Sequence, residues 1–394
     1  MKRQIFTLLL LLTGLPAFSQ NLKHDLDSML VNYVNDNQLH GCVTYVQQGN
    51  AVLHFESYGY QNIELKRKMT NDVIFDITSI SKFITAAGAL KLYEEGRFLL
   101  DDPVKKFLPQ FNNLKVMVNM GTDSCRIVPP ERDVTIRDLC RHTAGFGYGW
   151  GSDTIDYLYR LKRIDAAGQT RESYLKALCS IPLKFQPGSR WEYSCSIDIL
   201  GFLIEEITKM SLQEYLTKEF FIPLKMKHTG FYIKEKDIDK LSAHFSYSGG
   251  MLKQDEYPLP VQYLQVPAAF RGGGGIVSKA SDLANFFTMI LNYGDFKGRR
   301  ILQSGTVELL ISDQIGEIKD RSFDVPGYGF GVGVYSEKIP GKTKTVYWQG
   351  SPYNTCFFID FEKNLVAVFL TQNGPFGHLD IINRFTEIVE GNVF

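Results

Sequence analysis

Strand-like segments stand at both ends of this 394-residue chain, and helical patterns fill the part between them. Near the N-terminus, residues 42–46 and 51–55 are rich in β-branched and aromatic residues, and a turn containing Gly49-Asn50 separates them. Amphipathic helices are predicted at residues 22–37 and from about Leu379 onward. Four further strand-like runs lie near the C-terminus, at residues 331–335, 345–348, 355–361 and 365–371.

This arrangement predicts one antiparallel sheet that is built from both chain ends, flanked by helices, and interrupted by a mostly helical insertion. The expected fold class is therefore mixed α/β, of the α+β type. The sheet subdomain is predicted at about residues 20–75 and 296–394, and the helical subdomain at about residues 76–295. Because no internal repeat is present, residues 20–394 are expected to form one catalytic domain.

The first 19 residues have the features of a secretory signal peptide. Met1-Lys2-Arg3 is basic, residues 5–12 are apolar, and Ala17 and Ser19 are small residues before a cleavage site. The apolar run is too short to span a bilayer, and no later segment approaches ~18 consecutive apolar residues. We therefore expect cleavage of residues 1–19, export to the periplasm or the medium, and no stable membrane insertion.

Charge, histidine and cysteine patterns argue against several classes of function. The chain holds 43 Lys and Arg beside 43 Asp and Glu, with no basic run, so nucleic acid is not an expected partner. The seven histidines show no H-x-H or H-E-x-x-H spacing and the six cysteines no C-x-x-C, so neither a metal nor a cofactor is expected. Most cysteines are predicted to be small buried hydrophobic residues, with any disulfide pairing left open.

Ser79 and Lys82 stand three residues apart where a loop enters a predicted helix. Phe83, Ala87 and Leu90 follow at helical spacing, so the two polar side chains share one face of the first turn. A serine hydroxyl needs a base to take its proton, and a lysine serves when burial or nearby cations lower its pKa. The helix start also offers backbone N–H groups to an oxyanion. Because an N-capping serine shows the same S-x-x-K pattern, the neighbouring motifs decide between the two interpretations.

Several segments resemble one known family. Residues 75–82 and 92–104 are similar to the nucleophile helix of class C β-lactamases and related esterases, and residues 135–145 resemble the T-I-R-D-L-L-x-H-T-S-G element of that superfamily. Phe185-Gln186-Pro187-Gly188, leading to Tyr193-Ser194, and the glycine run at 272–275 resemble two later elements. The chain is identified as a member of the serine β-lactamase and penicillin-binding-protein superfamily, in its class C-related branch. The resemblance implies a β-lactamase/transpeptidase-like fold, with Ser79 as acyl-accepting nucleophile and Lys82 as its partner.

The second active-site motif of this family is usually Tyr-x-Asn, and here it is Tyr193-Ser194-Cys195. The resemblance implies that Tyr193 shuttles a proton between nucleophile and leaving group, which requires a neighbouring cation such as Lys82. Cys195 occupies the position of an amide that binds the acylamino side chain of β-lactam-type substrates. A thiol is a poor hydrogen-bonding substitute, so this substrate-binding position predicts weak recognition of acylated amino compounds.

The third motif is Lys-Thr-Gly in β-lactamases and often His-x-Gly in other relatives, and the matching residues are Trp348-Gln349-Gly350-Ser351. A cation at the first position would bind a substrate carboxylate, which Trp348 cannot do. The Trp-x-Gly pattern resembles that of family VIII carboxylesterases. It implies that Trp348, Gln349 and Gly350 contact the substrate, and that the backbone N–H groups of Ser79 and Ser351 form the oxyanion hole. A packed core aromatic is the alternative role for Trp348.

These motifs favour a serine hydrolase that forms an acyl-enzyme on Ser79, with carboxylesterase activity on small or medium esters. A β-lactamase or D-alanyl-D-alanine carboxypeptidase would use the same nucleophile, but the changed second and third motifs count against it. A non-catalytic binding module conflicts with the intact Ser79, Lys82 and Tyr193. No G-x-S-x-G is present, and His142 is expected to brace a loop. Acyl transfer to other acceptors, the physiological ester or amide substrate and the oligomeric state are left open.

Overall fold

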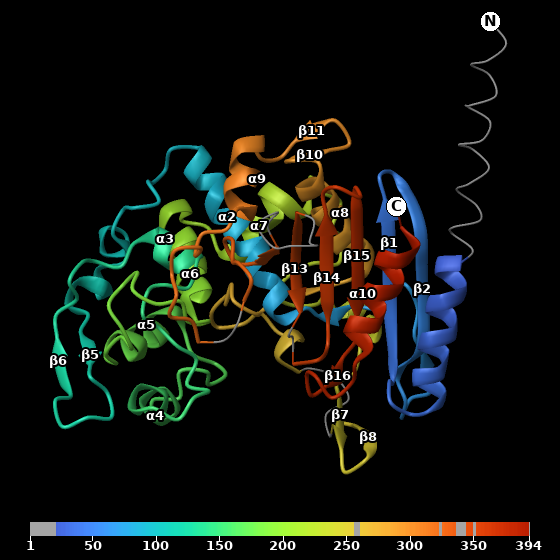
Figure 1. Cartoon of the computed structure of the whole chain (residues 1–394), viewed down its shortest axis with the longest axis horizontal. Coiled ribbons are helices and arrows are strands. Elements are labelled where there is room, and N and C mark those ends of the chain that lie inside the picture. The colour runs from blue at the N-terminus through green and yellow to red at the C-terminus, as the bar shows by residue number, and fades with distance from the viewer. Residues whose placement is uncertain (1–20, 256–260, 323–324, 336–343, 350–351, 394) are drawn as a thin grey trace, which may run out of the picture.

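The computed structural model describes residues 21–255, 261–322, 325–335, 344–349 and 352–393. Its main element is a seven-stranded antiparallel sheet in the order β12-β13-β14-β15-β1-β2-β3 (Figure 1). Val43 in β1 lies opposite Leu370 in β15, so the two chain ends meet in the middle of the sheet, and the predicted fold class is confirmed. The strands of this sheet are β1 (Gly41–Gln48), β2 (Ala51–Asn62), β3 (Arg67–Lys68), β12 (Gly333–Tyr335), β13 (Thr345–Gln349), β14 (Cys356–Asp360) and β15 (Leu365–Leu370).

The central strands are buried on both faces, and their side chains alternate between two cores. In β15, Leu365, Ala367 and Phe369 pack against the terminal helices, a helix at residues 21–35 and α10 (Ile381–Asn392). Val366 and Val368 belong to the larger core on the opposite face. Because successive strand residues point to opposite faces, a strand covered on both sides is apolar at every position.

Helices of the middle segment cover the other face of the sheet and extend away from it, on the left of Figure 1. The sheet-facing helix α8 (Ala280–Leu291) contacts β15, β1 and β14. Within the described ranges, no helix is both long enough and apolar enough to cross a membrane. The remaining helices are α2 (Ser81–Glu94), α3 (Ile136–Cys140), α4 (Thr154–Leu161), α5 (Arg171–Cys179), α6 (Ser196–Thr208), α7 (Leu212–Leu216) and α9 (Ser304–Ile311).

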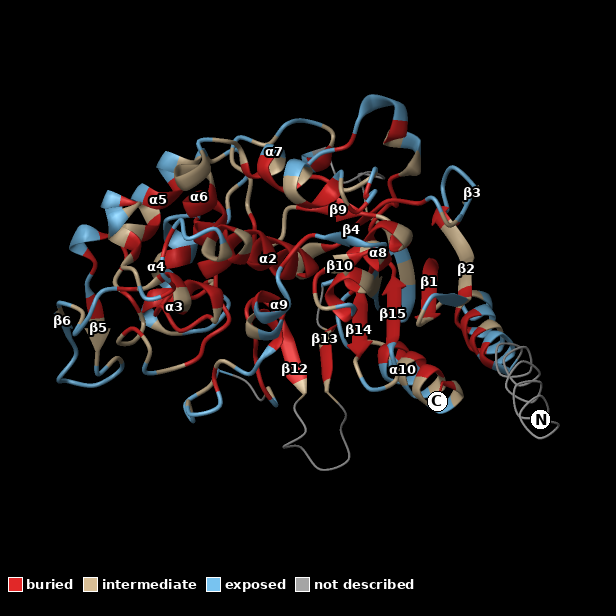
Figure 2. Cartoon of the chain, turned by 90° about the horizontal axis from the view of Figure 1, so that it is seen from above, coloured by how far each residue is buried: buried red, intermediate tan, exposed pale blue. Residues whose placement is uncertain are grey.

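Helix α2 is buried along most of its length, from Ser81 to Leu90, as the red ribbon in Figure 2 shows. It lies between the sheet layer and the helical layer and contacts α6, α7 and α9. A helix that is enclosed on all sides has no polar face, so the apolar spacing noted in the sequence describes only part of its buried surface. This central position carries Lys82 away from water.

Short strand pairs join distant parts of the chain around the start of α2. β4 (Phe75–Asp76) pairs with β9 (Val277–Ser278), which brings the residues before Ser79 beside the glycine run at 272–275. The other small sheets are β5 (Val116–Val118) with β6 (Arg126–Val128), β10 (Asp295–Phe296) with β11 (Arg299–Arg300), and β16 (Asn373–Gly374) with β7 (Phe245–Ser248) and β8 (Met251–Gln254).

Candidate active site

Ser79 lies in a short 3-10 turn, Thr78–Ile80, that leads directly into α2. Thr78 has a φ of 41°, a left-handed conformation that is uncommon for a non-glycine residue. The side chain of Asp76 holds this turn, because its Oδ1 accepts a hydrogen bond of 2.9 Å from the Thr78 N–H. Lys82 is on the first turn of α2, and its Nζ lies 3.1 Å from Ser79 Oγ. The predicted pairing of Ser79 and Lys82 on one helical turn is therefore present in the structure.

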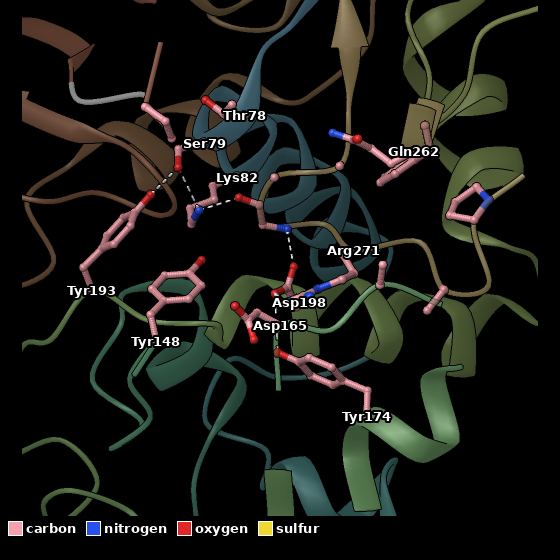
Figure 3. Close-up of a pocket in the computed structure, with 18 of the residues that line it drawn as sticks. Thr78, Ser79, Lys82, Tyr148, Asp165, Tyr174, Tyr193, Asp198, Gln262 and Arg271 are labelled. Carbon is pink, nitrogen blue, oxygen red and sulfur yellow. Dashed lines mark hydrogen bonds and ion pairs between the residues drawn. The ribbon is translucent and has the colours of Figure 1, made fainter. Parts of the chain in front are cut away.

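Tyr193 reaches the same hydroxyl from a segment more than one hundred residues away. Its phenolic O–H donates a hydrogen bond of 2.7 Å to Ser79 Oγ. Figure 3 shows the two side chains pointing toward each other. The following residue is held by His142, whose Nδ1 accepts a hydrogen bond of 3.3 Å from the Ser194 N–H and lies 3.1 Å from Ser194 Oγ. His142 is fully buried and braces the Tyr193 segment, as the sequence predicted.

A cavity of about 1040 Å³ opens over Ser79. Four of its lining side chains form a continuous series of stacked or tilted rings, which we call the aromatic wall: Tyr148, Trp150, Tyr193 and Trp348. The ring centroids of Tyr193 and Trp348 are 5.3 Å apart at 19°, and those of Tyr148 and Trp150 are 4.4 Å apart at 11°. Trp150 is 75% exposed whereas Trp348 is 9% exposed, so the wall runs from the surface to the buried nucleophile.

The third-motif residues are placed beside the nucleophile as far as the structure describes them. Trp348 and Gln349 lie on β13 and line the cavity. Gly350 and Ser351 fall outside the described residues, so the predicted contribution of the Ser351 N–H to an oxyanion hole stays a prediction.

Cys195 is not where a substrate-binding side chain would be expected. It is 1% exposed and is absent from the described lining of the cavity. Its thiol interacts with the hydroxyls of Tyr159 and Tyr174, in the helical layer. The tertiary position thus differs from the expected one, because Cys195 is the N-cap of α6 and its side chain packs behind the cavity surface. Four of the six cysteines are buried, as predicted, namely Cys42, Cys140, Cys195 and Cys356.

The sequence matches the Beta-lactamase family over residues 26–386, which is nearly the whole chain. The chain belongs to this family. It is 28% identical to esterase EstB of Burkholderia gladioli over 398 residues, covering 94% of this chain and 96% of that protein. It is also 30% identical to protein Rv1367c of Mycobacterium tuberculosis over 353 residues, covering 86% of each.

Among solved structures, the chain is similar to EstCE1, a hydrolase with promiscuous acyltransferase activity. The TM-score is 0.79 at 24% identity, and the match covers 95% of this chain and 99% of EstCE1. At this identity the likeness shows the shared fold. Family membership makes this protein a serine hydrolase of the β-lactamase fold, and the predicted recognition is confirmed.

Burial sets the protonation states of this β-lactamase-family site. Burial lowers the pKa of Lys82 from 10.5 to about 7, nearby Asp198 opposes this shift, and Arg271 adds to it. The amine is therefore uncharged in a large fraction of molecules at neutral pH. Burial raises the pKa of Tyr193, so the phenol keeps its proton at that pH. Lys82 is thus the group suited to accept the Ser79 proton, and Tyr193 is suited to donate one.

The same burial should make the fold less stable below about pH 7. The unfolded chain binds a proton at Lys82 with the ordinary pKa of 10.5, and the folded chain binds it only near pH 7. Between these values the unfolded state holds more protons, so the free energy of unfolding rises with pH across this window. Below the folded-state pKa the penalty is fully present, at a few kcal/mol by order of magnitude.

Replacing Lys82 with methionine should therefore raise the urea midpoint most at about pH 6, with a gain that shrinks toward about pH 10. Urea unfolding of both proteins across this range measures the difference. Lys91→Met, on the partly exposed end of the same helix, is the matched control and should show no such trend. A gain that is constant with pH, or that grows as the pH rises, would contradict the prediction.

Several residues at this site escaped the sequence analysis. Tyr148 and Trp150 alternate with glycines at 145–151, and this Gly-aromatic alternation was the available signal. Asp198 is the single charged residue among apolar neighbours early in α6, and Arg271 directly precedes the glycine run. Among the described residues, no group of three or more His, Cys, Asp or Glu side chains is arranged to hold a metal ion.

Proposed function

We propose that this protein is a carboxylesterase that cleaves small or medium neutral esters through an acyl-enzyme on Ser79. The observation that carries the proposal is the position of Ser79 Oγ, 3.1 Å from the Lys82 amine and 2.7 Å from the Tyr193 hydroxyl. A nucleophile between an uncharged base and a proton donor is the arrangement required for acyl transfer.

In the proposed acylation step, the Ser79 proton passes to Lys82 Nζ while the Oγ forms a bond to the ester carbonyl carbon. The tetrahedral intermediate then breaks its bond to the alkoxy group, which takes the Tyr193 proton and leaves as the alcohol. Lys82 then returns its proton to the Tyr193 phenolate, so that both groups are restored while Ser79 carries the acyl group. Deacylation reverses this sequence with water as the attacking group, and the acid is released.

The aromatic wall and the third motif support esters over β-lactams. Trp348 presents an indole face at the position where a cation would bind a substrate carboxylate. The cavity is lined by one guanidinium among the described residues, Arg271, and this group is already paired with Asp198 at 3.0 Å. A substrate carboxylate beside Trp348 would therefore lose its hydration without gaining the cation that the third motif supplies in β-lactamases.

Side-by-side assays of the purified protein on p-nitrophenyl esters and on nitrocefin test the proposal. Turnover of the esters with little hydrolysis of nitrocefin supports it. Efficient hydrolysis of nitrocefin, with esters barely turned over, would instead establish the β-lactamase alternative. Absence of turnover on both, in a protein that also fails to react with a fluorophosphonate, would favour a binding module.

We also propose that the protein is exported, with residues 1–19 removed as a signal peptide. The basic start, the short apolar run and the small residues Ala17 and Ser19 support this proposal. In the native host, the protein recovered from the periplasm or medium should begin at Gln20 by intact mass. Recovery of a full-length chain from the cytosolic fraction alone would refute it.

A further inference from the structure

A chain of polar contacts links Lys82 to an ion pair elsewhere in the cavity lining. Besides approaching Ser79, Lys82 Nζ donates a hydrogen bond to the carbonyl oxygen of Gly273. The N–H of the same glycine donates to Asp198 Oδ1 at 2.8 Å, and Asp198 Oδ2 pairs with Arg271 Nη2 at 3.0 Å. Figure 3 shows this series running from Ser79 to Arg271. One carboxylate oxygen of Asp198 therefore holds the backbone, and the other holds the guanidinium and accepts a hydrogen bond of 3.5 Å from the Tyr174 hydroxyl.

The backbone at Gly273 approaches Asp198 so closely that any side chain at this position would force the carboxylate to shift. A Cβ atom on Gly273 would lie 2.7 Å from Asp198 Oδ1 and 3.3 Å from the Tyr148 hydroxyl. Asp198 itself is 2% exposed and is held by the buried first turn of α6. Because both partners are confined, the Gly273 carbonyl has little freedom to move away from Lys82.

The described groups around Lys82 differ in whether they carry charge near neutral pH. Burial raises the pKa of Tyr148, Tyr193 and Cys195 and lowers that of His142, so these four are neutral. The rings of Tyr148 and Tyr193 lie 5.5 and 4.7 Å from Lys82 Nζ. The charges that act on the amine are therefore those of Asp198 and Arg271, which favour opposite protonation states.

We propose that Asp198 and Arg271 are positioning residues for the general base of the proposed esterase reaction. Asp198 holds Gly273 so that its carbonyl keeps the Lys82 amine beside Ser79. Arg271 neutralises the Asp198 carboxylate, so that the amine is uncharged when it takes the Ser79 proton. Without Arg271 the buried carboxylate would retain the proton on Lys82; without Asp198 the amine would lose both its support and its balancing charge. This inference rests on the proposed function of Ser79 and Lys82.

The test is the pH profile of kcat/KM on p-nitrophenyl acetate, whose acid limb reports the base in the free enzyme. Arg271→Gln should move this limb to higher pH and Asp198→Asn to lower pH, each by roughly 0.5–1 unit, the scale for one nearby charge in a partly screened site. Asparagine keeps an oxygen for the Gly273 N–H, so it isolates the charge. Asp198→Ala removes this acceptor as well, and should lower the plateau kcat by about tenfold or more with little change in KM.

Opposite shifts in the two charge-neutralising variants would establish the proposal, because general loss of structure cannot move one limb in two directions. Arg271→Lys keeps the positive charge and should leave the acid limb at the wild-type pH. Arg171→Gln breaks an ion pair with Glu206 in the helical layer and should also leave the acid limb unchanged. If Arg271→Gln does not fold, two results remain decisive. The acid limb of kcat/KM should move to lower pH in Asp198→Asn, and it should stay at the wild-type pH in Arg271→Lys. If the wild-type protein hydrolyses the ester, the inference is overturned when neither charge-neutralising variant moves the acid limb, or when both move it in the same direction. An inactive wild type would instead refute the esterase proposal.

Discussion

Replacement of Ser79 by alanine should abolish fluorophosphonate labelling and lower kcat/KM on p-nitrophenyl esters by ~10³-fold or more. The wild-type enzyme should take up a single label. The effect is large because no other described hydroxyl shares the position of Ser79 between Lys82 and Tyr193, at 3.1 and 2.7 Å. Without the Oγ there is no group to carry the acyl chain, and water must attack the ester directly.

The two neighbours of Ser79 should matter less than the nucleophile itself. Lys82→Ala and Tyr193→Phe should each lower kcat on the order of 10²-fold or more, the scale of a positioned proton-transfer group. Ser124→Ala, at an exposed serine in a distant loop, is the control and should keep both labelling and turnover. Persistent labelling of the Ser79→Ala protein at the wild-type rate would remove Ser79 from the mechanism. Intact-protein mass spectrometry and steady-state assays measure both results.

The second large effect expected is a preference for short p-nitrophenyl esters over nitrocefin of at least about 10²-fold in kcat/KM. Apolar acyl groups gain roughly 0.8 kcal/mol per buried methylene against the aromatic wall. A carboxylate that faces Trp348 without a cation loses several kcal/mol of hydration. Burial of the acyl group and loss of carboxylate hydration both favour the esters, so the ratio of kcat/KM between esters and nitrocefin is expected to be large.

Substitutions at Trp348 separate charge recognition from packing in this preference. Trp348→Lys places a cation on β13, and Trp348→His places a group there that can become one on protonation. Both should narrow the ratio of kcat/KM between esters and nitrocefin. Trp348→Phe keeps an aromatic ring against Tyr193 without adding charge, and should leave the ratio close to wild type. Because Trp348 is only 9% exposed, its replacement can destabilise the fold, so a thermal melt of each variant checks that it is folded. If the ratio of kcat/KM on esters to that on nitrocefin is the same in the histidine, lysine and phenylalanine variants, the indole acts through packing alone.

Much of the architecture follows from local patterns that any segment carries by itself. The alternation at residues 42–46 and the apolar run at 365–371 predict strands, because period-two burial depends on neighbouring residues alone. The spacing of Ser79 and Lys82 places both on one helical turn for the same reason. The resemblance of several motifs, in their order along the chain, to those of a known family then predicted that Tyr193 and Trp348 belong to the site of Ser79. No local sequence rule connects them to it.

The chemistry of the site was decided by the tertiary structure. Lys82 becomes a base near neutral pH because α2 is enclosed by other elements, and the cost of burying a cation depends on all of them together. Asp198 and Arg271 act on this lysine only because α6 and the glycine run meet beside α2. Side-chain identity at each position is local, whereas desolvation and charge proximity are properties of segments brought together in space. For this reason the sequence determined which groups are present, and the fold determined their protonation and their partners.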